Sequence, residues 1–464
     1  MKFKKQLFRA AMCGAVLSLA SGVAGAQQSA EAGPPQQILV KWKPKSLTMA
    51  DTTVSAARAL SDASARFGTQ LESKRTIVGF EVLKLRTRVS EADLQEMVAT
   101  LSADPAVELA EVDALMQTQF TPNDAQYNQQ WHYFEAAGGL NLPTAWDLST
   151  GAGVRVGVID TGYRPHADLA ANLVRTASGA VAGYDFISDS FVANDGGGRD
   201  NNAIDPGDFA AAGACAAGSR ASNSSWHGTH VSGTVAAVTN NGTGVAGVAF
   251  GAKVLPLRAL GRCGGLTSDI AAAIVWGSGG AVAGLPANPF PAKVLNLSLG
   301  GTGACGATTQ NAINSARSRG TVVVVAAGNS NRNASNATPA NCAGVVTVAA
   351  VGRNGGKASY SNFGANVDVA APGGSAGTGN GVLSTLNAGA TTPGADALAF
   401  YQGTSMATPH VAGTVALMLS RNPALTPTQV ESLLRSSARA FPATCSQCGT
   451  GIVNARAAVV AAGP

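Results

Sequence analysis

Beyond residue 120 the chain alternates short apolar runs with longer segments of small and apolar residues. The runs are rich in Val, Ile and Leu, and they predict strands over residues 154–160, 254–257, 294–299, 321–327 and 345–351. The longer segments predict helices over residues 227–238, 267–276, 308–319, 405–420 and 427–437. Strands that are apolar throughout are typical of a parallel sheet buried on both faces. We therefore expect an α/β fold in which helices cover both faces of a parallel sheet.

The segment before residue 121 has a different pattern. It predicts strands over residues 38–42, 76–86 and 107–116, and helices over residues 49–67 and 91–101. A further short strand near residues 68–71 completes the order β-α-β-β-α-β. This order predicts a small α+β domain of the ferredoxin-like type over residues 27–120, followed by the larger domain over residues 121–464.

Residues 1–26 combine a basic start, an apolar run over residues 10–20 and the triplet Ala24-Gly25-Ala26. Such a segment is typical of a secretory signal peptide with an A-x-A cleavage site. Its apolar run is too short to cross a membrane. We therefore expect a secreted, extracellular protein whose mature form has no membrane anchor.

Charge places few further limits on the function. Charged residues make up 13% of the 464 residues, and the formal net charge is +5. Four of these positive charges lie in the predicted signal peptide, on Lys2, Lys4, Lys5 and Arg9. The rest of the chain is therefore about neutral, and it contains no basic patch suited to binding nucleic acid.

Cysteine usage fits an exported protein. The chain has seven Cys, and removal of Cys13 with the signal peptide leaves six. An even number of Cys in an exported chain predicts disulfides. The spacing favours the pairs Cys215–Cys263, Cys305–Cys342 and Cys445–Cys448, although other pairings of six Cys are open.

Three side chains with complementary chemistry stand at the ends of predicted elements. Asp160 ends a strand, His227 begins a helix, and Ser405 begins another helix directly after a Gly-Thr pair. Parallel strands place their carboxyl ends at one edge of a sheet, where the active sites of such folds lie. A serine at a helix N-terminus can cap the helix, but its oxygen also lies beside N–H groups that stabilise an anion. Together, a carboxylate, an imidazole and a hydroxyl suit nucleophilic catalysis.

The motifs around these residues resemble those of the subtilisin-like serine proteases. Asp-Thr-Gly begins at Asp160, His-Gly-Thr-His at His227, and Gly-Thr-Ser-Met-Ala-Thr-Pro-His at Gly403, in the chain order of that family. The resemblance runs from about Trp131 to the C-terminus. It implies a subtilisin-like fold and a secreted serine endopeptidase of broad specificity. In that family's mechanism Ser405 is the nucleophile, His227 the general base and Asp160 the residue that orients the base.

The same resemblance implies further site residues. Asn329 follows an Ala-Ala-Gly run, and its amide would donate to the oxyanion together with the Ser405 N–H. A loop residue in a left-handed turn is the alternative for Asn329. Two edge segments would pair with an extended substrate, and they comprise Ser298, Leu299, Gly300, Gly264 and Gly265. The primary pocket would lie between Ser298–Gly300 and the pair Ala327 and Gly328. Its small, uncharged walls predict a preference for apolar or aromatic residues before the scissile bond.

The smaller domain resembles the propeptides of the same family. The resemblance implies that residues 27–120 assist folding, inhibit the protease and are then cut off by it. Residues 116–120 would lie extended in the active cleft before cleavage, and the mature chain would start near residues 121–124. An ordinary accessory domain is the alternative. The expected partners are protein and peptide substrates and the chain's own propeptide, and the expected mature form is a monomer.

Acidic residues gather in a Gly-rich segment between Asp160 and His227. They include Asp195, Asp200, Asp205 and Asp208. Closely spaced carboxylates repel one another, and calcium, which binds carboxylate and carbonyl oxygens, would neutralise them. We therefore expect a structural calcium ion held by these four residues. A solvated loop, or pairing of the acids with Arg199, is the alternative.

Other functions fit only part of the pattern. A protease that processes a single partner would share the three catalytic residues, but the small, neutral pocket predicts broad specificity. A binding protein on the same fold would not need Ser405, His227 and Asn329 together. An esterase of the α/β-hydrolase type is excluded, because Ser405 lacks the G-x-S-x-G motif and comes last in the chain order.

Overall fold

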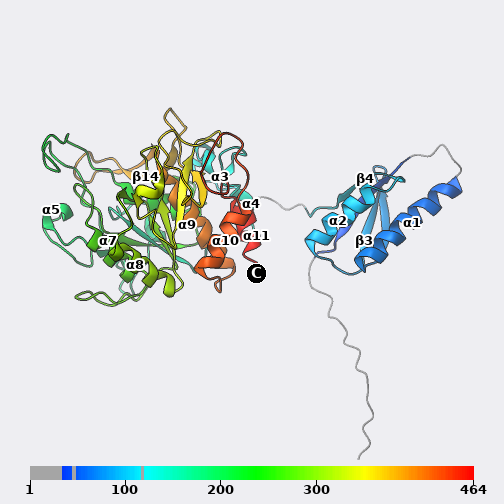
Figure 1. Ribbon diagram of the computed structural model, residues 1–464, viewed down its shortest axis with the longest axis horizontal. Coiled ribbons are helices and arrows are strands. Elements are labelled where there is room, and N and C mark those ends of the chain that lie inside the picture. Colours follow the sequence, from blue (N-terminus) through cyan, green and yellow to red (C-terminus); the bar gives the residue numbers. More distant parts are fainter. Residues whose placement is uncertain (1–33, 44–48, 116–119, 464) are drawn as a thin grey trace, which may run out of the picture. The chain divides into compact units, whose positions relative to one another are not determined.

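The computed structural model describes residues 34–43, 49–115 and 120–463. The chain divides into two compact units, residues 1–118 and 119–464, and Figure 1 labels several of their elements. The predicted signal peptide lies outside the described residues, as do residues 116–119 at the predicted junction. No helix within the described ranges is long and apolar enough to cross a membrane.

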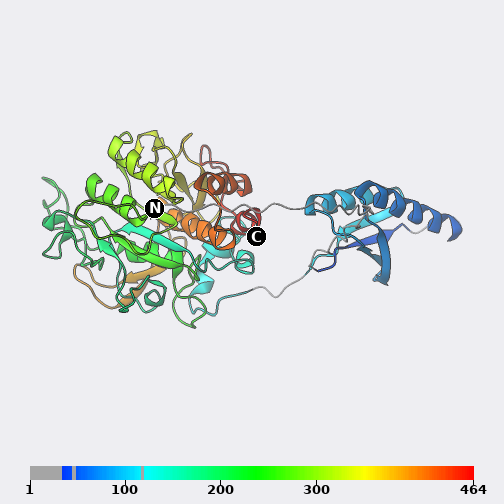
Figure 2. The ribbon, with the colours of Figure 1, turned by 90° about the horizontal axis from the view of Figure 1, so that it is seen from below.

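The N-terminal unit is a four-stranded antiparallel sheet with both helices on one side (Figure 2). Its strands lie in the order β2-β3-β1-β4. Leu94 and Met97 of the second helix are buried against Ile38 and Leu83 of the sheet. The elements are β1 (Gln37–Trp42), α1 (Met49–Phe67), β2 (Leu71–Ile77), β3 (Phe80–Leu85), α2 (Glu91–Ser102) and β4 (Val107–Val112). The predicted order β-α-β-β-α-β is therefore confirmed.

One predicted strand of this unit is wrong. The pattern predicts a single strand over residues 76–86, but the chain reverses within it. β2 ends at Ile77, and β3 begins at Phe80, which pairs with Ile77. Val78 and Gly79 between them have positive φ angles of 47° and 84°, as two-residue hairpin loops require. The apolar run through Val78 hides this turn from a reading of hydrophobicity, whereas Gly79 is the residue that marks it.

The C-terminal unit is built on a seven-stranded sheet. In the order β13-β12-β10-β8-β5-β7-β6, every neighbouring pair of strands is parallel. The strands are β5 (Arg155–Asp160), β6 (Tyr184–Asp185), β7 (Lys253–Arg258), β8 (Val294–Leu297), β10 (Val322–Ala326), β12 (Val346–Val351) and β13 (Val369–Pro372). The five predicted strands are confirmed with shifted ends, whereas β6 and β13 are too short to stand out in the sequence pattern.

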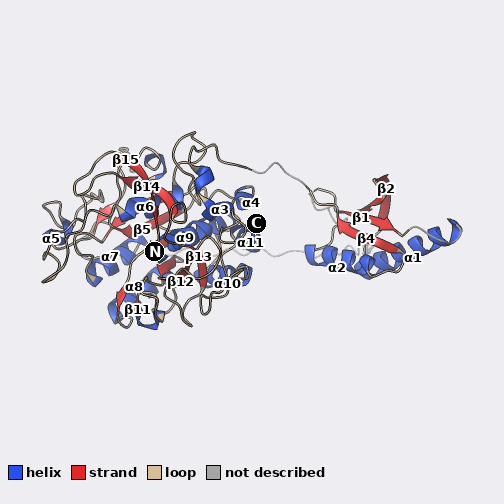
Figure 3. Cartoon of the chain, turned by 90° about the horizontal axis from the view of Figure 1, so that it is seen from above, coloured by secondary structure: helices blue, strands red, loops and turns tan. Residues whose placement is uncertain are grey.

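Helices cover both faces of this sheet, as predicted (Figure 3). Val322 and Val324 of β10 are buried on one side with residues of α6 and α9. Val323 and Val325 are buried on the other side with residues of α7 and α8. The longer helices are α6 (His227–Ala236), α7 (Thr267–Gly277), α8 (Ala307–Ser318), α9 (Thr404–Arg421), α10 (Pro427–Ser437) and α11 (Ala455–Ala461). Because alternate residues of a buried strand face opposite sides, both faces need an apolar cover.

Smaller elements complete the unit. The antiparallel pairs are β9 (Gly301–Thr302) with β11 (Ala337–Thr338), and β14 (Val382–Asn387) with β15 (Asp396–Tyr401). The short α-helices are α3 (Trp131–Phe134), α4 (Pro143–Trp146) and α5 (Ser190–Ala193). These pieces had no clear signal in the periodicity, because each is short or mixes polar with apolar residues.

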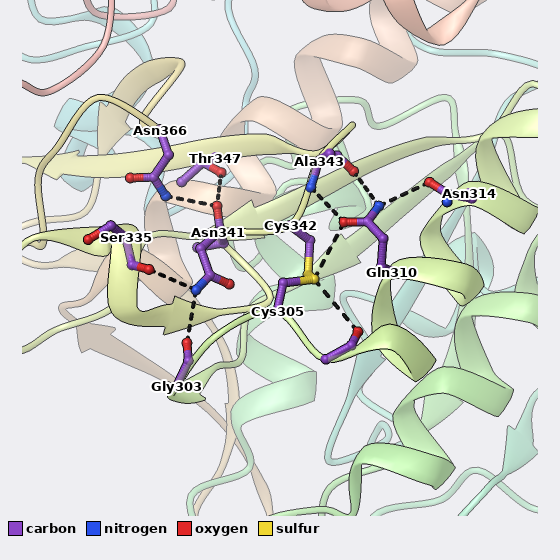
Figure 4. The surroundings of a disulfide bond; sticks show 12 residues. Gly303, Cys305, Gln310, Asn314, Ser335, Asn341, Cys342, Ala343, Thr347 and Asn366 are labelled. Atoms are coloured by element: carbon purple, nitrogen blue, oxygen red, sulfur yellow. Dashed lines mark hydrogen bonds between the residues drawn. A yellow bond between two sulfur atoms is a disulfide. The ribbon is translucent and has the colours of Figure 1, made fainter.

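The predicted disulfides are confirmed as Cys215–Cys263, Cys305–Cys342 and Cys445–Cys448. Figure 4 shows the surroundings of Cys305–Cys342, which joins the chain after β9 to the chain after β11. Beside this disulfide, Asn341 Nδ2 donates to the carbonyls of Gly303 at 2.8 Å and Ser335 at 2.9 Å. The disulfide and the amide together hold β9 and β11 side by side.

Candidate active site

Asp160 and His227 meet at the carboxyl edge of the large sheet. Asp160 is the last residue of β5 and is fully buried, and His227 is the first residue of α6. Asp160 Oδ1 lies 2.7 Å from His227 Nδ1 and also accepts the Thr161 N–H at 2.8 Å. The imidazole Nδ1 is thereby held by a carboxylate, which leaves Nε2 to accept a proton.

Glycine allows this close approach of strand and helix. A Cβ on Gly228, the residue after His227, would lie 2.2 Å from the carbonyl oxygen of Gly162. A Cβ on Gly162 would lie 2.4 Å from the carbonyl oxygen of Ala203. A larger residue at Gly228 would push the start of α6 away from the chain at Asp160, and a larger residue at Gly162 would push away the chain at Ala203. The glycine of the His-Gly-Thr-His motif is therefore needed for the contact between Asp160 and His227.

Ser405 is the second residue of α9 and lies beside Ser298, which follows β8. Its hydroxyl donates to the carbonyl of Ser298 at 3.1 Å, and the hydroxyl of Ser298 donates to the carbonyl of Ser405 at 2.8 Å. Asn296 Nδ2 in turn donates to Ser298 Oγ at 2.9 Å. The Ser405 hydroxyl must therefore turn away from Ser298 before its proton can pass to an imidazole. Catalytic hydrogen bonds commonly reach their final geometry only when substrate binds.

Asn329 lies near the start of α9, where its side chain bonds to Thr404. Its Oδ1 accepts the N–H and the hydroxyl of Thr404, both at 2.8 Å. Because the oxygen is occupied in this way, the Nδ2 donors are directed elsewhere. Asn329 and Ser405 line the same cavity, which has a volume of about 360 Å³. The sequence alternative, in which Asn329 is only a left-handed loop residue, does not hold, because Asn329 is absent from the positive-φ residues of the described chain.

The predicted pocket residues line this cavity. Ser298, Leu299, Gly300, Ala327 and Gly328 form part of its wall. Sequence reasoning missed further residues of the lining, which include Gly301, Thr302, Arg332, Asn336, Ala337 and Thr338. The sequence signal for these residues was indirect. Cys305 and Cys342, which form the disulfide in Figure 4, follow β9 and β11 in the chain.

Two other predicted positions lie outside the cavity. Gly264 and Gly265 are exposed in the turn after β7, next to Cys263, and do not belong to the described residues that line it. Phe120 was expected to end the segment that lies in the cleft. Its ring instead lies 5.8 Å from that of Trp146 and 5.5 Å from that of Phe250, so it packs with the C-terminal unit.

The charge on His227 is set by opposing effects. Burial disfavours the imidazolium, but the negative charge and the hydrogen bond of Asp160 favour it, and Asp208 and Asp205 add to the effect. The result is a pKa for His227 above its ordinary value. A base of this kind binds a proton more firmly than free imidazole does, which helps it to take the proton of a serine.

The other histidines near the site are buried and neutral. His230 stacks on Tyr401 at 4.6 Å, and burial lowers its pKa to about 3. His410 Nδ1 donates to the carbonyl of Met406, and its Nε2 lies 2.8 Å from His132 Nδ1. Burial lowers the pKa of His410 to about 4 and that of His132 well below the usual range. These residues therefore support the packing around α6 and α9, and His132 was missed by sequence reasoning.

The four acids predicted to hold calcium are not brought together. Asp195 pairs with Arg258 at 2.8 Å, and the carboxylate of Asp200 accepts the N–H of Asn202 at 2.8 Å. Asp205 and Asp208 instead accept hydrogen bonds from residues beside Asp160 and His227. Within the described ranges, no group of three or more His, Cys, Asp or Glu could hold a metal ion.

The described structure therefore gives no support for a calcium site on these four residues, because no three of them come together. Arg258 also pairs with the buried Asp185, and Arg199 pairs with Asp269 at 2.7 Å rather than with the predicted ligands. Backbone N–H groups also donate to Asp195 and Asp205. Structural calcium stays a prediction for this protein.

Comparisons with known proteins agree with this geometry. Residues 151–451 match the model of the Subtilase family. An extracellular protease of Xanthomonas campestris pv. campestris is 53% identical over 436 residues, which are 92% of this chain and 73% of that protein. An extracellular basic protease of Dichelobacter nodosus is 40% identical over 390 residues, which are 82% of this chain and 62% of that protein.

A solved structure extends the likeness to three dimensions. A protease from Pseudoalteromonas arctica is 63% identical to this chain and superposes with a TM-score of 0.72. The match covers 74% of this chain and 100% of the solved chain. The subtilisin-like α/β fold expected from the motifs is thereby confirmed for the C-terminal unit.

Proposed function

Since this chain belongs to the subtilase family and is a serine endopeptidase, we propose that Ser405 is its nucleophile, with His227 as general base and Asp160 as the residue that orients the base. The observation that carries this assignment is the 2.7 Å contact between Asp160 Oδ1 and His227 Nδ1. Ser405, the second residue of α9, lies at the same edge of the sheet, where it bonds to Ser298 after β8.

The proposed reaction follows from the donors and acceptors at this edge. The Ser405 oxygen attacks the peptide carbonyl while His227 Nε2 takes the hydroxyl proton. His227 then gives that proton to the leaving amine. The developing oxyanion accepts hydrogen bonds from Asn329 Nδ2 and from the N–H of Ser405. That N–H lies in the first turn of α9, where such groups lack intrahelical partners. Water then attacks the acyl group while His227 Nε2 takes its proton, and this proton passes to the Ser405 oxygen as the acid product leaves.

We further propose a broad specificity with apolar or aromatic residues before the scissile bond. An extended substrate would pair with Ser298–Gly300 on one side and with Gly264 and Gly265 on the other. Among the described residues that line the cavity, Arg332 is the only charged one. A guanidinium at this position disfavours Lys and Arg side chains in the pocket. A panel of peptides that is cleaved mainly after Lys or Arg would contradict this specificity.

The N-terminal unit is proposed to be a propeptide that the enzyme removes itself, after residues 1–26 have directed export. Its compact fold and its place directly before the peptidase unit support this role. We also propose that the N-terminal unit inhibits the mature enzyme and that the mature form is a monomer.

Purified precursors test the function and the self-processing together. Ser405→Ala should keep its full propeptide, whereas the wild type should release a mature chain that begins near residues 120–123. Ser420→Ala is the matched control, because it removes a hydroxyl from the far end of the same helix, where it bonds to the Ala152 carbonyl. Processing of purified Ser405→Ala at the wild-type rate would overturn the proposal.

A further inference from the structure

Two acids of the Gly-rich segment reach the backbone on either side of His227. The carboxylate of Asp208 accepts the N–H of Ser225 at 2.6 Å and its hydroxyl at 2.7 Å. The hydroxyl oxygen of Ser225 then accepts the backbone N–H of His227 at 3.3 Å. Asp208 is therefore connected to the start of α6 through one serine.

Asp205 makes a second connection of the same kind. It is buried, and its carboxylate accepts the hydroxyl of Thr161 at 2.7 Å. The oxygen of Thr161 accepts the N–H of Gly228 at 3.0 Å, while its own N–H donates to Asp160. Asp205 therefore joins the residue after Asp160 to the residue after His227.

The chain between these connections needs to be held. Trp226, directly before His227, has a φ of 49°, a left-handed conformation that a bulky side chain rarely adopts. Such a conformation is unfavourable and persists only where its surroundings hold it. Here Trp226 Nε1 donates to the Gly389 carbonyl at 2.7 Å, and the Tyr401 hydroxyl donates to the Ser225 carbonyl at 2.8 Å.

We propose that Asp208 and Asp205 are positioning residues of the peptidase, which act through Ser225 and Thr161 to hold His227 against Asp160. Neither carboxylate makes a hydrogen bond to the imidazole or to Ser405 within the described structure. Their effect is on geometry, because Ser225 and Thr161 pin the backbone at both ends of the strained turn. The inference rests on His227 being the general base, as proposed above.

The test compares purified, processed Asp208→Ala, Ser225→Ala and the double variant. A serine-reactive fluorophosphonate counts the active sites, so that kcat refers to folded enzyme. We expect kcat on a peptide substrate to fall by about 10- to 100-fold in each single variant, the size of effect that a misplacement of about 1 Å produces. KM should stay within about twofold, because the substrate edges are untouched. The double variant should be no slower than the worse single variant, since both changes break one connection.

Two further variants control for charge and for folding. Asp208→Asn keeps one carbonyl oxygen that can accept from Ser225, so its kcat should lie between those of wild type and Asp208→Ala. Asp396→Asn removes the same charge from a carboxylate that accepts a backbone N–H at Ala167, and it should match the wild type. If Asp208→Ala fails to fold, Asp208→Asn and Ser225→Ala give the same comparison.

Several results would overturn the inference. One is an unchanged kcat per active site in Asp208→Ala and Ser225→Ala, and another is a double variant whose losses multiply. A third is a loss in Asp208→Asn that added Ca²⁺ reverses and that EDTA reproduces in the wild type, since the acids would then be metal ligands. A wild type without activity that depends on Ser405 would instead overturn the proposed function, which separates the two failures.

Discussion

Ser298 and Ser405 hydrogen bond to each other in both directions. Each hydroxyl donates to the other residue's backbone carbonyl, at 2.8 Å from Ser298 and 3.1 Å from Ser405. The end of β8 and the first turn of α9 are thereby held at a set separation. Ser298 was predicted from the sequence to bind substrate, and the structure adds a direct contact with the proposed nucleophile.

Replacing Ser298 with Ala should destabilise the peptidase and slow it. The change removes the donor to the Ser405 carbonyl and leaves the buried Asn296 Nδ2 without its acceptor. A buried polar group left unpaired costs about 1–3 kcal/mol. Denaturant titration and kcat measured on the same preparation check this expectation. Ser298→Thr, which keeps a hydroxyl, is the control, and equal stability of Ser298→Ala and wild type would contradict the expectation.

Removing the Asn329 amide should lower kcat with little change in KM. The amide is proposed to meet the oxyanion, which exists only after attack, so its loss affects the transition state more than substrate binding. We expect kcat to fall by about 10² to 10³ in Asn329→Ala, the magnitude found for a donor of this kind in subtilisin.

Asn329→Asp separates the donor from the packing. It keeps an oxygen for the N–H and hydroxyl of Thr404 but has no N–H to donate. It should therefore lose at least as much activity as Asn329→Ala. Activity near the wild-type level in Asn329→Asp would show that the amide nitrogen is not the donor.

The acid limb of the pH profile should lie above the ordinary pKa of imidazole. Burial lowers the pKa of His227, but Asp160, Asp208 and Asp205 together raise it by more than burial lowers it. The net shift of the pKa is therefore upward from 6.5. Only neutral His227 can take the serine proton, so kcat/KM should fall as the pH drops through this raised pKa. Profiles of kcat/KM at low salt measure it. A limb at or below pH 6.5 would contradict the shift.

The same profile should move when a nearby charge is removed. Asp208→Asn takes away one of the negative charges that raise the pKa of His227, so its acid limb should shift to lower pH. Asp396 is not among the groups that raise this pKa. Asp396→Asn should therefore keep the wild-type limb, and equal shifts in both variants would point to a general charge effect.

Loss of the Cys305–Cys342 disulfide should reduce both stability and selectivity. The bond spans 37 residues and holds β9 and β11, whose residues line the cavity beside Ser405. Closing such a loop is worth about 4 kcal/mol in the chain-entropy model. The double variant Cys305→Ser and Cys342→Ser should unfold more easily, and its preference among peptides that differ before the scissile bond should weaken.

Cys445 and Cys448 provide the matched control. Their disulfide spans three residues, and neither Cys belongs to the described lining of the cavity. Replacing both with Ser should cost about 2 kcal/mol by the same model and leave the peptide preference unchanged. Equal loss of selectivity in the two double variants would show that the disulfide after β9 has no special influence on the pocket.

Acid should destabilise the fold through the buried pair His132 and His410. Burial lowers the pKa of both, to about 4 for His410, whereas the unfolded chain binds protons near pH 6.5. A depressed pKa means that the unfolded state gains protons first, so stability is lost as the pH falls from 6.5 towards 4. For His410 alone the loss reaches about 3 kcal/mol at pH 4. Denaturant titrations at several pH values over this range measure the free energy of unfolding. Its dependence on pH should be weaker in His410→Gln than in the wild type, and an equal dependence would contradict the assignment.

Hydrophobic periodicity predicted most of the large sheet because its central strands are buried on both faces. Each residue of β10, for example, is buried, and so the run Val322–Ala326 stands out without alternation. The same rule failed for the hairpin at Val78 and Gly79, where an apolar residue occupies a turn and is 89% exposed. It also missed the β14–β15 pair, because β15 is mostly half-buried or exposed and carries mixed residues.

The proposed catalytic residues could be predicted because they lie in contiguous motifs. Gly228 of the His227 motif is also required by the close packing, so there the motif and the geometry reflect the same constraint. The wall formed by β9 and β11 was not predictable in this way. Its residues are small or polar and have no motif of their own, and only their pairing in the fold brings them to the cavity.

By itself, the sequence determined which segments are buried, where a motif glycine lets a strand end touch a helix start, and which side chains can serve as acid, base and nucleophile. Only the tertiary structure decided what the acids at Asp205 and Asp208 do. A carboxylate binds whichever donors or ions the fold brings within about 3 Å, and no local pattern specifies them. Here the donors are Thr161 and Ser225, which the packing of β5 against α6 brings within reach, so acids that resemble metal ligands along the chain bond next to the proposed catalytic pair.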